Sequence, residues 1–562
     1  MGWLAGYFEK YPEIAVFLAI GLGYWIGSWK VRGIGLGPVT GSLLAGVLVG
    51  YFWHVPVSDT AKALLFLMFM YGIGYSAGPG FVRGVREGGW RWVVLGCVVP
   101  LTGLLAAYAM AKLLKLELGF ASGMMSGGLT ESPIIGTTSE AIRSLNIPEE
   151  EKHRLISQIP VADALCYLFG TIGVILFCSH VGPWLLRVDL KAEARKLEEE
   201  MGIERVAPGV SSAWQMFEFR AYEVVPGGEA DGMSIGQAES HIANERIFIE
   251  RVRRGGEVLT ASSEFVLRAG DVVAAMGPQE SLLRVMGERR EVADRELLDV
   301  PSATFDVVIR SRSLSGRTLA DIASDAQQMR GVFLKSIRRG GEKIPIGPGT
   351  KIYQGDLLTL HGLEPAVRRV AALAGDVLQE QGTDYLALGL GIFAGALLGA
   401  AVAFPIGGIH VALGSSVATL LLGLAMGWRN SVRPSFAILA PDAIDFMKSI
   451  GLAGFVAMIG LKAGPVFVKA LQEVGLTVFL GGVVVTLVPQ ITGLLVGRYV
   501  LRLNPLLLLG GLAGAQTMTA GLAAVQERSD SPVAVIGYSS TVAFGHVLLS
   551  IGGTALVWML HA

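Results

Sequence analysis

The chain alternates between long apolar stretches and one long polar block. Crossing a bilayer takes about 20 mostly apolar residues, and stretches of that kind occur in both halves. In the first half they cover roughly residues 14–29, 36–53, 61–82, 90–114 and 156–180. In the second half they cover roughly residues 385–404, 407–428, 444–468, 476–501 and 534–560. The pattern predicts a polytopic α-helical membrane protein with five spans in each half.

Two segments rich in small residues interrupt these stretches at matching places. Residues 119–148 precede the last stretch of the first half, and residues 506–531 precede the last stretch of the second. Pro133 removes a backbone hydrogen-bond donor from the first segment. Irregular backbone at membrane depth persists only where protein buries it or where it lines a wet cavity. Each segment is therefore predicted to be a re-entrant or broken helix.

The two halves also match each other in sequence at a nearly constant spacing. The matched pairs are Gly74 and Gly460, Ala77 and Ala463, Gly78 and Gly464, Pro79 and Pro465, Phe81 and Phe467, Val82 and Val468, Glu87 and Glu473, Gly127 and Gly514, Thr130 and Thr517, and Glu140 and Glu527. Because each half has an odd number of spans, the second copy would be inserted upside down. The prediction is two inverted repeats, 1–186 and 381–562, which are typical of transporters.

The charge distribution separates a soluble-like block from the two apolar halves. Of the 562 residues, 93 are Lys, Arg, Asp or Glu, and 56 of these lie between Arg187 and Glu380. This excludes a single soluble globule, a fibrous protein and a disordered chain. The net charge of −1 offers no long-range field for nucleic acid. The block has no cysteine, so we expect it in the cytosol, with both termini outside.

The polar block is itself duplicated. Residues 253–257 and residues 338–342 are both Arg-Arg-Gly-Gly-Glu, and a Gly-Asp pair follows each at the same distance. The block is predicted to hold a linker, 187–208, with a solvated charged helix, and then two α+β modules, 209–293 and 294–380. The arginines are expected to be exposed charges in hairpin turns. The modules could bind a small ligand or ion, or hold a dimer together.

Motifs of common enzymes are missing from the sequence. The cysteines are Cys97, Cys166 and Cys178, all in apolar runs, which suits neither a disulfide framework nor a zinc site. The sequence has no phosphate-binding loop of the Walker type and no His-Glu-x-x-His motif. We therefore expect a protein that is not an enzyme and that holds no cofactor or metal.

The first interrupted segment and its counterpart carry the candidate substrate-binding residues. These are Gly127, Gly128, Thr130, Ser132, Thr137 and Thr138 in the first segment and Gly514, Gln516, Thr517 and Thr519 in the second. Glycines expose backbone N–H groups, and a half-helix N-terminus attracts a carboxylate. Hydroxyl and amide groups add donors. The alternative is that small residues serve tight helix packing alone.

Charges within apolar runs are functional candidates by default because they are expensive there. Lys462, beside a predicted helix break at Ala463-Gly464-Pro465, could pair with an acidic substrate, or its side chain could extend to the membrane interface. Asp163 could hold a substrate ammonium group or cap a helix end. Glu131 and Glu140 are expected to face water. His410 and His546 are expected to be packed rather than to bind a ligand.

The paired repeats, with Ala-Gly-Pro at 77–79 and 463–465 and Gly-Gly-Leu-Thr at 127–130, resemble the aspartate:alanine exchanger family of bacterial secondary transporters. The middle modules resemble the regulatory modules of potassium-transport proteins (TrkA-C or RCK-C type). The resemblance implies an electrogenic antiporter of L-aspartate and L-alanine in the bacterial inner membrane, with alternating access and substrate held at broken helices. It also implies a homodimer. A transporter of other dicarboxylates or organic anions, or a channel gated by the modules, remains an alternative.

Overall fold

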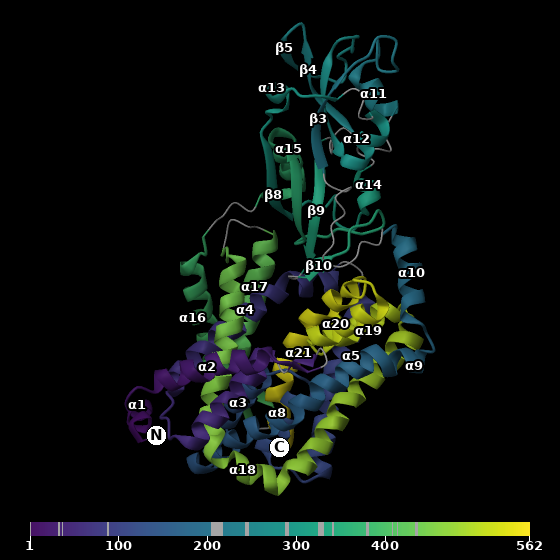
Figure 1. Ribbon diagram of the computed structural model, residues 1–562. Coiled ribbons are helices and arrows are strands. Elements are labelled where there is room, and N and C mark those ends of the chain that lie inside the picture. The colour runs from purple at the N-terminus through teal and green to yellow at the C-terminus, as the bar shows by residue number, and fades with distance from the viewer. Residues whose placement is uncertain are drawn as a thin grey trace.

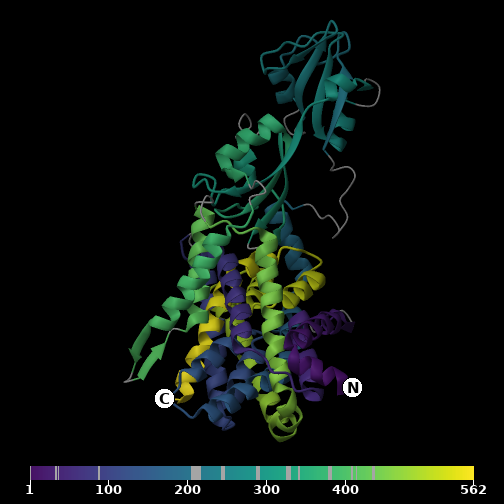
Figure 2. The ribbon, with the colours of Figure 1, turned by 90° about the vertical axis from the view of Figure 1, so that its left-hand side faces the viewer.

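The structure is a computed structural model that describes residues 2–31, 34–35, 37–86, 89–203, 217–241, 247–286, 291–323, 331–339, 342–377, 382–406, 409–412, 414–432 and 437–561. The two halves of the chain form one helical bundle, and the middle of the chain forms two sheet modules. Figure 1 shows the two modules stacked end to end on one side of the bundle. Both chain termini lie toward the other end of the bundle, as Figure 2 also shows.

Helices account for all ten of the predicted apolar stretches. The first half contributes α1 (Gly2–Lys10), α2 (Pro12–Ser28), α3 (Gly37–Phe52), α4 (Asp59–Arg86), α5 (Trp90–Leu113), α8 (Glu149–Leu176), the π-helical turn η1 (Phe177–Val181) and α9 (Gly182–Leu186). The second half contributes α16 (Tyr385–Ala401), α17 (Ser415–Val432), α18 (Pro441–Leu495), the π-helical turn η5 (Val496–Val500) and α21 (Val535–His561). Six helical segments among the described residues are long and apolar enough to cross a membrane. Two of them, Pro441–Pro465 and Val474–Val500, belong to α18.

The structure adds one detail to the predicted spans and corrects another. The stretches predicted as 444–468 and 476–501 belong to a single helical run, α18, which descends and then rises again through the bundle in Figure 1. The stretch predicted to begin at residue 407 begins as a helix only at Ser415, because residues before it form a small hairpin, β13 (Ala403–Ile406) with β14 (Ile409–Ala412). A similar hairpin, β1 (Lys30–Val31) with β2 (Ile34–Gly35), joins α2 to α3.

The interrupted segments form two helical hairpins. In the first hairpin, α6 (Leu118–Gly128) is followed by α7 (Pro133–Arg143). In the second hairpin, α19 (Pro505–Ala515) is followed by α20 (Thr519–Ser529). All four helices have 11 residues, which gives each about 16 Å at 1.5 Å per residue. Each arm therefore reaches about half of a hydrocarbon core about 30 Å thick.

Packing interleaves the two halves of the chain rather than keeping them apart. α3 of the first half packs along α18 of the second, and α4 packs along α17. α5 and α8 pack on α21 and α18, respectively. The bundle therefore has a shared core, and the hairpins are held between helices of both halves.

The two modules share one sheet topology. In the first module, the strand order is β5 (Glu257–Thr260), β4 (Phe248–Arg254), β6 (Val272–Pro278), β3 (Phe217–Glu223) and β7 (Glu291–Val292). In the second module, the order is β10 (Glu342–Ile344), β9 (Val332–Arg339), β11 (Leu357–Leu363), β8 (Ser302–Ile309) and β12 (Gly375–Val377). Short helices α11 (Ile235–His241), α12 (Gln279–Met286), α13 (Arg295–Leu298), α14 (Leu319–Ala323) and α15 (Glu364–Ala374) complete the two modules. All strand pairs are antiparallel.

The linker helix α10 (Leu190–Met201) begins at Asp189, whose side chain accepts a hydrogen bond from Ala192 N at 2.9 Å. The charge run predicts a helix that is solvated on every side. Instead, Leu190 and Ala194 are buried, and the helix packs on α19 and α20. Asn504, the N-cap of α19, donates to Glu193 of this helix at 3.4 Å. The second hairpin therefore lies at the module end of the bundle.

Candidate functional site

Glycines set the position of both hairpins against long helices. Gly123 and Gly127 of α6 face α8, where an added Cβ would overlap the carbonyl oxygens of Ile159 and Asp163. Gly514 of α19 faces α21 in the same way, at the carbonyl of Tyr538. Such close approach of helix backbones is the role of small residues in membrane proteins. The candidate glycines therefore fix where each hairpin ends, and Asp163 and Tyr538 are equivalent neighbours of the two hairpins.

Each hairpin turns at a threonine in the left-handed region. Thr130 has φ 55° and its sequence counterpart Thr517 has φ 56°. A β-branched residue rarely adopts this conformation because its side chain crowds the backbone, and strain of this kind is typical of functional sites. Neither α7, which starts after Ser132, nor α20, which starts after Met518, has a side chain capping its N-terminus. At α7, Pro133 has no N–H, and the N–H groups of Ile134 and Ile135 bond to the carbonyls of Glu131 and Ser132, so the start of α20 is the better place for a carboxylate.

The two turns touch each other. Thr130 Oγ1 donates to the backbone carbonyl of Gln516 at 3.3 Å, and Thr517 Oγ1 donates to Glu131 Oε2 at 2.5 Å. The first hairpin enters from the opposite end of the bundle to the second, because Arg143 at the end of α7 reaches Asp59 at the start of α4. Pro79, about 30 Å along α4 from Asp59, lies beside Gly355 of the second module. Asp59 and the outer end of the first hairpin are therefore at the end of the bundle away from the modules. The tips therefore meet near mid-depth.

Glu131 is the central acidic group of this junction. Its side chain is 2% exposed, and Oε1 lies 3.2 Å from His546 Nδ1 on α21. The expectations that Glu131 faces water and that His546 is only packed are both wrong. The turn after α6 folds back under α21 and buries the carboxylate, and the two sequence positions, 415 residues apart, give no sign of this contact.

Asp163 is connected to the same turn through the hydroxyl group of Ser126. It is 2% exposed and accepts a hydrogen bond from Ser126 Oγ at 2.6 Å. The alternative that it caps a helix end is wrong, since α8 continues on both sides of it. Ser126 Oγ also lies 3.2 Å from the carbonyl of Glu131. Asp163 therefore supports the turn that carries Glu131.

Gln516 connects the second turn to α18. Its Oε1 accepts a hydrogen bond from Gln490 Nε2 at 2.7 Å, and its own Nε2 is buried without a hydrogen-bond partner. Thr486, one turn before Gln490, donates to the carbonyl of Gly128 at 2.7 Å. Thr486 and Gln490 are fully buried. The sequence analysis overlooked both, although a glutamine inside an apolar helix is a signal of function.

The other candidates lie farther from the junction. Thr137 and Thr138 bond back to the carbonyl of Ile134 within α7 and pack against Gly553 of α21. Thr519 Oγ1 lies 3.1 Å from the hydroxyl of Tyr538. Thr137 and Thr138 are thus buried within the first hairpin, whereas Thr519 is exposed at the start of α20.

Lys462 lies at the far end of the first hairpin rather than at the turns. Its Nζ is 3.2 Å from Asp59 Oδ1, which also contacts Lys62 at 2.8 Å and Arg143 at 3.2 Å. Arg143 ends α7, so this cluster is about 16 Å from the turns. The predicted break at Pro465 is absent, because α18 continues through it. Substrate binding by Lys462 stays a prediction.

Glu140 does not face water as expected. Its carboxylate accepts hydrogen bonds from the backbone N–H groups of Ser415 and Ser416 and from the Ser416 hydroxyl. A carboxylate at a helix N-terminus is stabilised by the exposed N–H groups and by the helix dipole. Glu140 therefore ties the first hairpin to the start of α17. The side chain of His410 lies outside the described residues.

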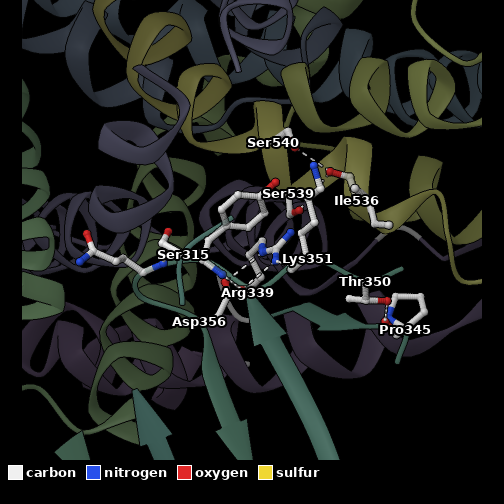
Figure 3. Close-up of polar contacts among 11 residues, drawn as sticks. Ser315, Arg339, Pro345, Thr350, Lys351, Asp356, Ile536, Ser539 and Ser540 are labelled. Atoms are coloured by element: carbon white, nitrogen blue, oxygen red, sulfur yellow. Dashed lines mark hydrogen bonds and ion pairs between the residues drawn. The ribbon is translucent and has the colours of Figure 1, made fainter. Parts of the chain in front are cut away.

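Of the four arginines in the duplicated motifs, Arg253, Arg254 and Arg339 are paired with aspartates, whereas Arg338 is exposed as expected. Arg254 donates to both oxygens of Asp271 at 2.8 and 2.6 Å, and Arg339 donates to both oxygens of Asp356 at 2.9 and 2.7 Å. Figure 3 shows Arg339 between Asp356 and Lys351, with Ser539 and Ser540 of α21 nearby. The duplicated Arg-Gly-Gly and Gly-Asp motifs are thus two halves of one contact. The sequence did not reveal this pairing, because the arginine and the aspartate lie in separate parts of each module and only the strand order brings them together.

In the first module, the arginine–aspartate contact shifts the pKa of both partners. Burial alone would raise the pKa of the Asp271 carboxyl, but the hydrogen bonds from Arg254 and Arg268 N outweigh burial and hold the pKa below its usual range. In the same pair, the pKa of Arg254 is raised, first by its hydrogen bond to Asp271. The pair therefore stays charged at neutral pH and fixes the β4 strand end to the turn before β6.

Among the described residues, no group of three or more His, Cys, Asp or Glu side chains is arranged to hold a metal ion. The junction offers hydroxyls, amides, helix N-termini and one buried carboxylate. Such a set offers hydrogen-bond donors to an anionic group and an acceptor to a cationic one.

Comparisons with known proteins place the helical bundle in a family. The model of a family described as a predicted permease membrane region (Asp-Al_Ex) matches residues 15–182 and 387–558. An uncharacterized transporter of Bradyrhizobium diazoefficiens is 46% identical over 91% of this chain and 99% of its own length. Similar relatives, also named uncharacterized transporters, are 36% identical in Shewanella oneidensis, over the whole of both chains, and 35% identical in Bordetella bronchiseptica, over 99% of this chain and 98% of that one. No solved structure matches the chain.

Proposed function

The chain belongs to the Asp-Al_Ex permease family and is a membrane transport protein, and we propose that it is a secondary antiporter that exchanges L-aspartate for L-alanine. The observation that carries the proposal is the buried junction of the two hairpin turns, with Glu131 between Thr517 and His546. A substrate held there would lie near mid-depth, between two hairpins that enter from opposite ends of the bundle.

The junction suits an α-amino acid. Donors for the substrate's α-carboxylate are the uncapped N-terminus of α20 and the unpartnered Nε2 of Gln516. Glu131 supplies an acceptor for the α-ammonium group. A dicarboxylate without an ammonium group would bring a second negative charge next to this buried carboxylate, which is costly at low dielectric. Amino acids are therefore favoured over dicarboxylates as substrates.

We propose that the two halves are inverted repeats. Supporting this, the two hairpins enter from opposite ends of the bundle and carry their left-handed threonines at equivalent positions. A second pair of equivalent residues, Lys115 with φ 51° and Arg502 with φ 51°, precedes the hairpins in the same way. Inverted repeats with a site at their interface support alternating access. Movement of one hairpin at a time would expose the junction to one side only.

Exchange of these two amino acids would move charge. Aspartate entering as a monoanion and alanine leaving as a zwitterion would carry one net negative charge inward per cycle. That movement is worth about 2.3 kcal/mol per 100 mV of membrane potential. We place the protein in the bacterial inner membrane, with the two modules in the cytosol as regulatory or dimer-forming units.

Counterflow in proteoliposomes tests the substrate. Vesicles loaded with L-alanine should take up external L-aspartate, and uptake should rise when the interior is made positive. Succinate and malate should compete weakly. Uptake of dicarboxylates with no uptake of amino acids would contradict the proposal, and currents far above transporter turnover would favour a channel.

Labelling of introduced cysteines tests the orientation. Ser262 and Ser313 lie in the first and second modules, and single cysteines at these positions should resist a membrane-impermeant thiol reagent in intact cells. Both should react once the cells are broken. Reaction in intact cells would reverse the orientation.

A further inference from the structure

Glu131 requires a positive partner in every state of the transporter. An isolated carboxylate in the interior of a membrane protein is expensive, and buried charges there are paired as a rule. Oε2 receives one neutral hydroxyl, that of Thr517. In the part of the chain that the structure describes, His546 is the one basic side chain within ion-pair distance of Glu131.

Among the side chains that the structure describes, no second cation lies within ion-pair distance of Glu131 to compete with His546. The ionisable groups that face Glu131 and His546 are acidic or phenolic: Tyr538 on α21 and Tyr167 and Asp163 on α8. Helices α6 and α19, which also pack on α21, contain no ionisable residue. Among side chains that the structure describes, the other charged residues of elements packed on α21 lie at helix ends, on strand β10 or in other contacts: Asp59, Lys62, Arg91, Lys112, Glu140, Arg143, Glu342, Lys343 and Arg429.

Exposure differs between the two members of the pair. The Glu131 side chain is 2% exposed, whereas the His546 side chain is 26% exposed. A proton can therefore leave His546 toward the open side of the pair, while Glu131 stays covered. Glu131 holds the negative charge in place, and the imidazole is the member that can change its charge.

We propose that His546 is protonated in the empty transporter and is the cation that the substrate's ammonium group replaces at Glu131. The inference rests on the proposed function, because it needs a substrate with an ammonium group. In the empty state, Nδ1–H of the imidazolium donates to Oε1. When substrate binds, its ammonium group donates to Glu131, the imidazolium loses one proton to water, and the neutral imidazole remains. Two cations do not share the site because like charges repel strongly at low dielectric.

Protons then compete with substrate for Glu131. At acid pH the imidazolium form is favoured, so the substrate must displace a proton and its apparent affinity falls. At alkaline pH the imidazole is already neutral, so no proton is displaced. With one proton released per substrate, KM should rise toward about tenfold per pH unit as the pH is lowered.

The KM of external alanine in alanine–alanine exchange is the direct readout, since its side chain carries no charge. Wild-type protein in proteoliposomes should show the acid rise in KM. His546→Gln, which keeps a hydrogen-bond donor but does not titrate, should have a KM constant within about twofold from pH 5.5 to 8. His153→Gln is the matched control, because His153 is exposed at the start of α8, and it should behave as wild type. A pH-independent wild type, or an unchanged acid rise in His546→Gln, would overturn the proposal.

Calorimetry on the wild type covers the case in which His546→Gln does not fold. Alanine binding to purified protein at about pH 6, measured in buffers with different heats of ionisation, should release close to one proton per alanine. Binding without proton release overturns this inference and leaves the proposed function standing. Failure of alanine to bind or exchange at any pH overturns both.

Discussion

The two hairpins have nearly the same backbone. Their arms have equal lengths, both turn at a left-handed threonine, and a glycine of each presses against a carbonyl of a long helix. Thr130 and Thr517 are equivalent, as are Gly127 and Gly514. The fold therefore treats the two sides of the membrane alike, which a transporter needs if either side is to open onto the same site.

The chemistry of the two hairpins differs sharply. The first hairpin carries Glu131, and the equivalent position of the second is Met518. Asp163 faces the first hairpin where Tyr538 faces the second. The negative charge of the site thus comes from one side, and the second hairpin contributes amide and hydroxyl groups. A shared fold provides access, and the unshared side chains provide recognition.

Replacing the charge itself should have the largest effect. Glu131→Gln keeps the shape but removes the partner of the substrate ammonium, and loss of a buried charge partner costs about 2–5 kcal/mol. We expect kcat/KM for aspartate and for alanine to fall by about 100-fold in proteoliposome exchange. Met518→Leu, the equivalent position of the other hairpin, should change it by less than about threefold. Equal losses in the two variants would contradict the asymmetry.

Filling the close helix contacts should damage both hairpins alike. Gly127→Ala and Gly514→Ala each place a methyl group against the backbone of the facing helix, and overpacking costs about 1–3 kcal/mol. Both should lower the melting temperature of the detergent-solubilised protein. Gly389→Ala on α16 is the control, because an added Cβ there meets nothing within 4 Å. Melting of either hairpin variant at the control's temperature would remove the structural equivalence.

Replacing Asp163, which faces the first hairpin, should reduce transport more than replacing Tyr538, which faces the second. Asp163→Asn removes a buried acid that supports the first turn, and we expect exchange to fall by about tenfold. Tyr538→Phe removes a hydroxyl 3.1 Å from Thr519 Oγ1, worth about 1 kcal/mol, which corresponds to about a fivefold loss at most. Initial rates of aspartate uptake, normalised to protein in the membrane, compare them. A larger loss in Tyr538→Phe would place the more important support on the second hairpin.

Lys462→Met should have the smallest effect. Lys462 is 41% exposed and is one of three cations around Asp59, and exposed ion pairs contribute about 0–1 kcal/mol. We expect exchange of both amino acids to change by less than about threefold, with Lys469→Met as a control on the same helix. Selective loss of aspartate exchange would instead put Lys462 on the path of the substrate's side-chain carboxylate, as the sequence alone predicts.

The sequence predicted that these two segments are re-entrant or broken helices, because the cause of the interruption is local. Glycine spacing, Pro133 and the repeated threonines are visible in the chain itself, and the match between Thr130 and Thr517 pointed to equivalent sites. The pairing of Glu131 with His546 is different, since it depends on how a turn packs under a helix 415 residues later in the chain. No periodicity in either segment carries that information.

Pairing across a sheet was missed for a similar reason. The sequence shows Arg254 and Asp271 as two separate repeated motifs, and only the strand order, with β4 beside β6, brings them together. Lys462 shows the opposite error. Its closeness to Pro465 in sequence suggested a break in the helix, but packing of α18 against α3 keeps the helix continuous through that proline.

The half-depth reach of the hairpins also determines where the membrane potential acts. In a transporter that admits water along one hairpin, the electric field does not fall evenly over about 30 Å of hydrocarbon. It falls mainly across the thin dry layer between the two turns, where Thr130 meets the carbonyl of Gln516 at 3.3 Å. A charged substrate that passes only this layer then crosses most of the voltage, so a hairpin movement of a few ångströms is enough to make each transport cycle sensitive to the membrane potential.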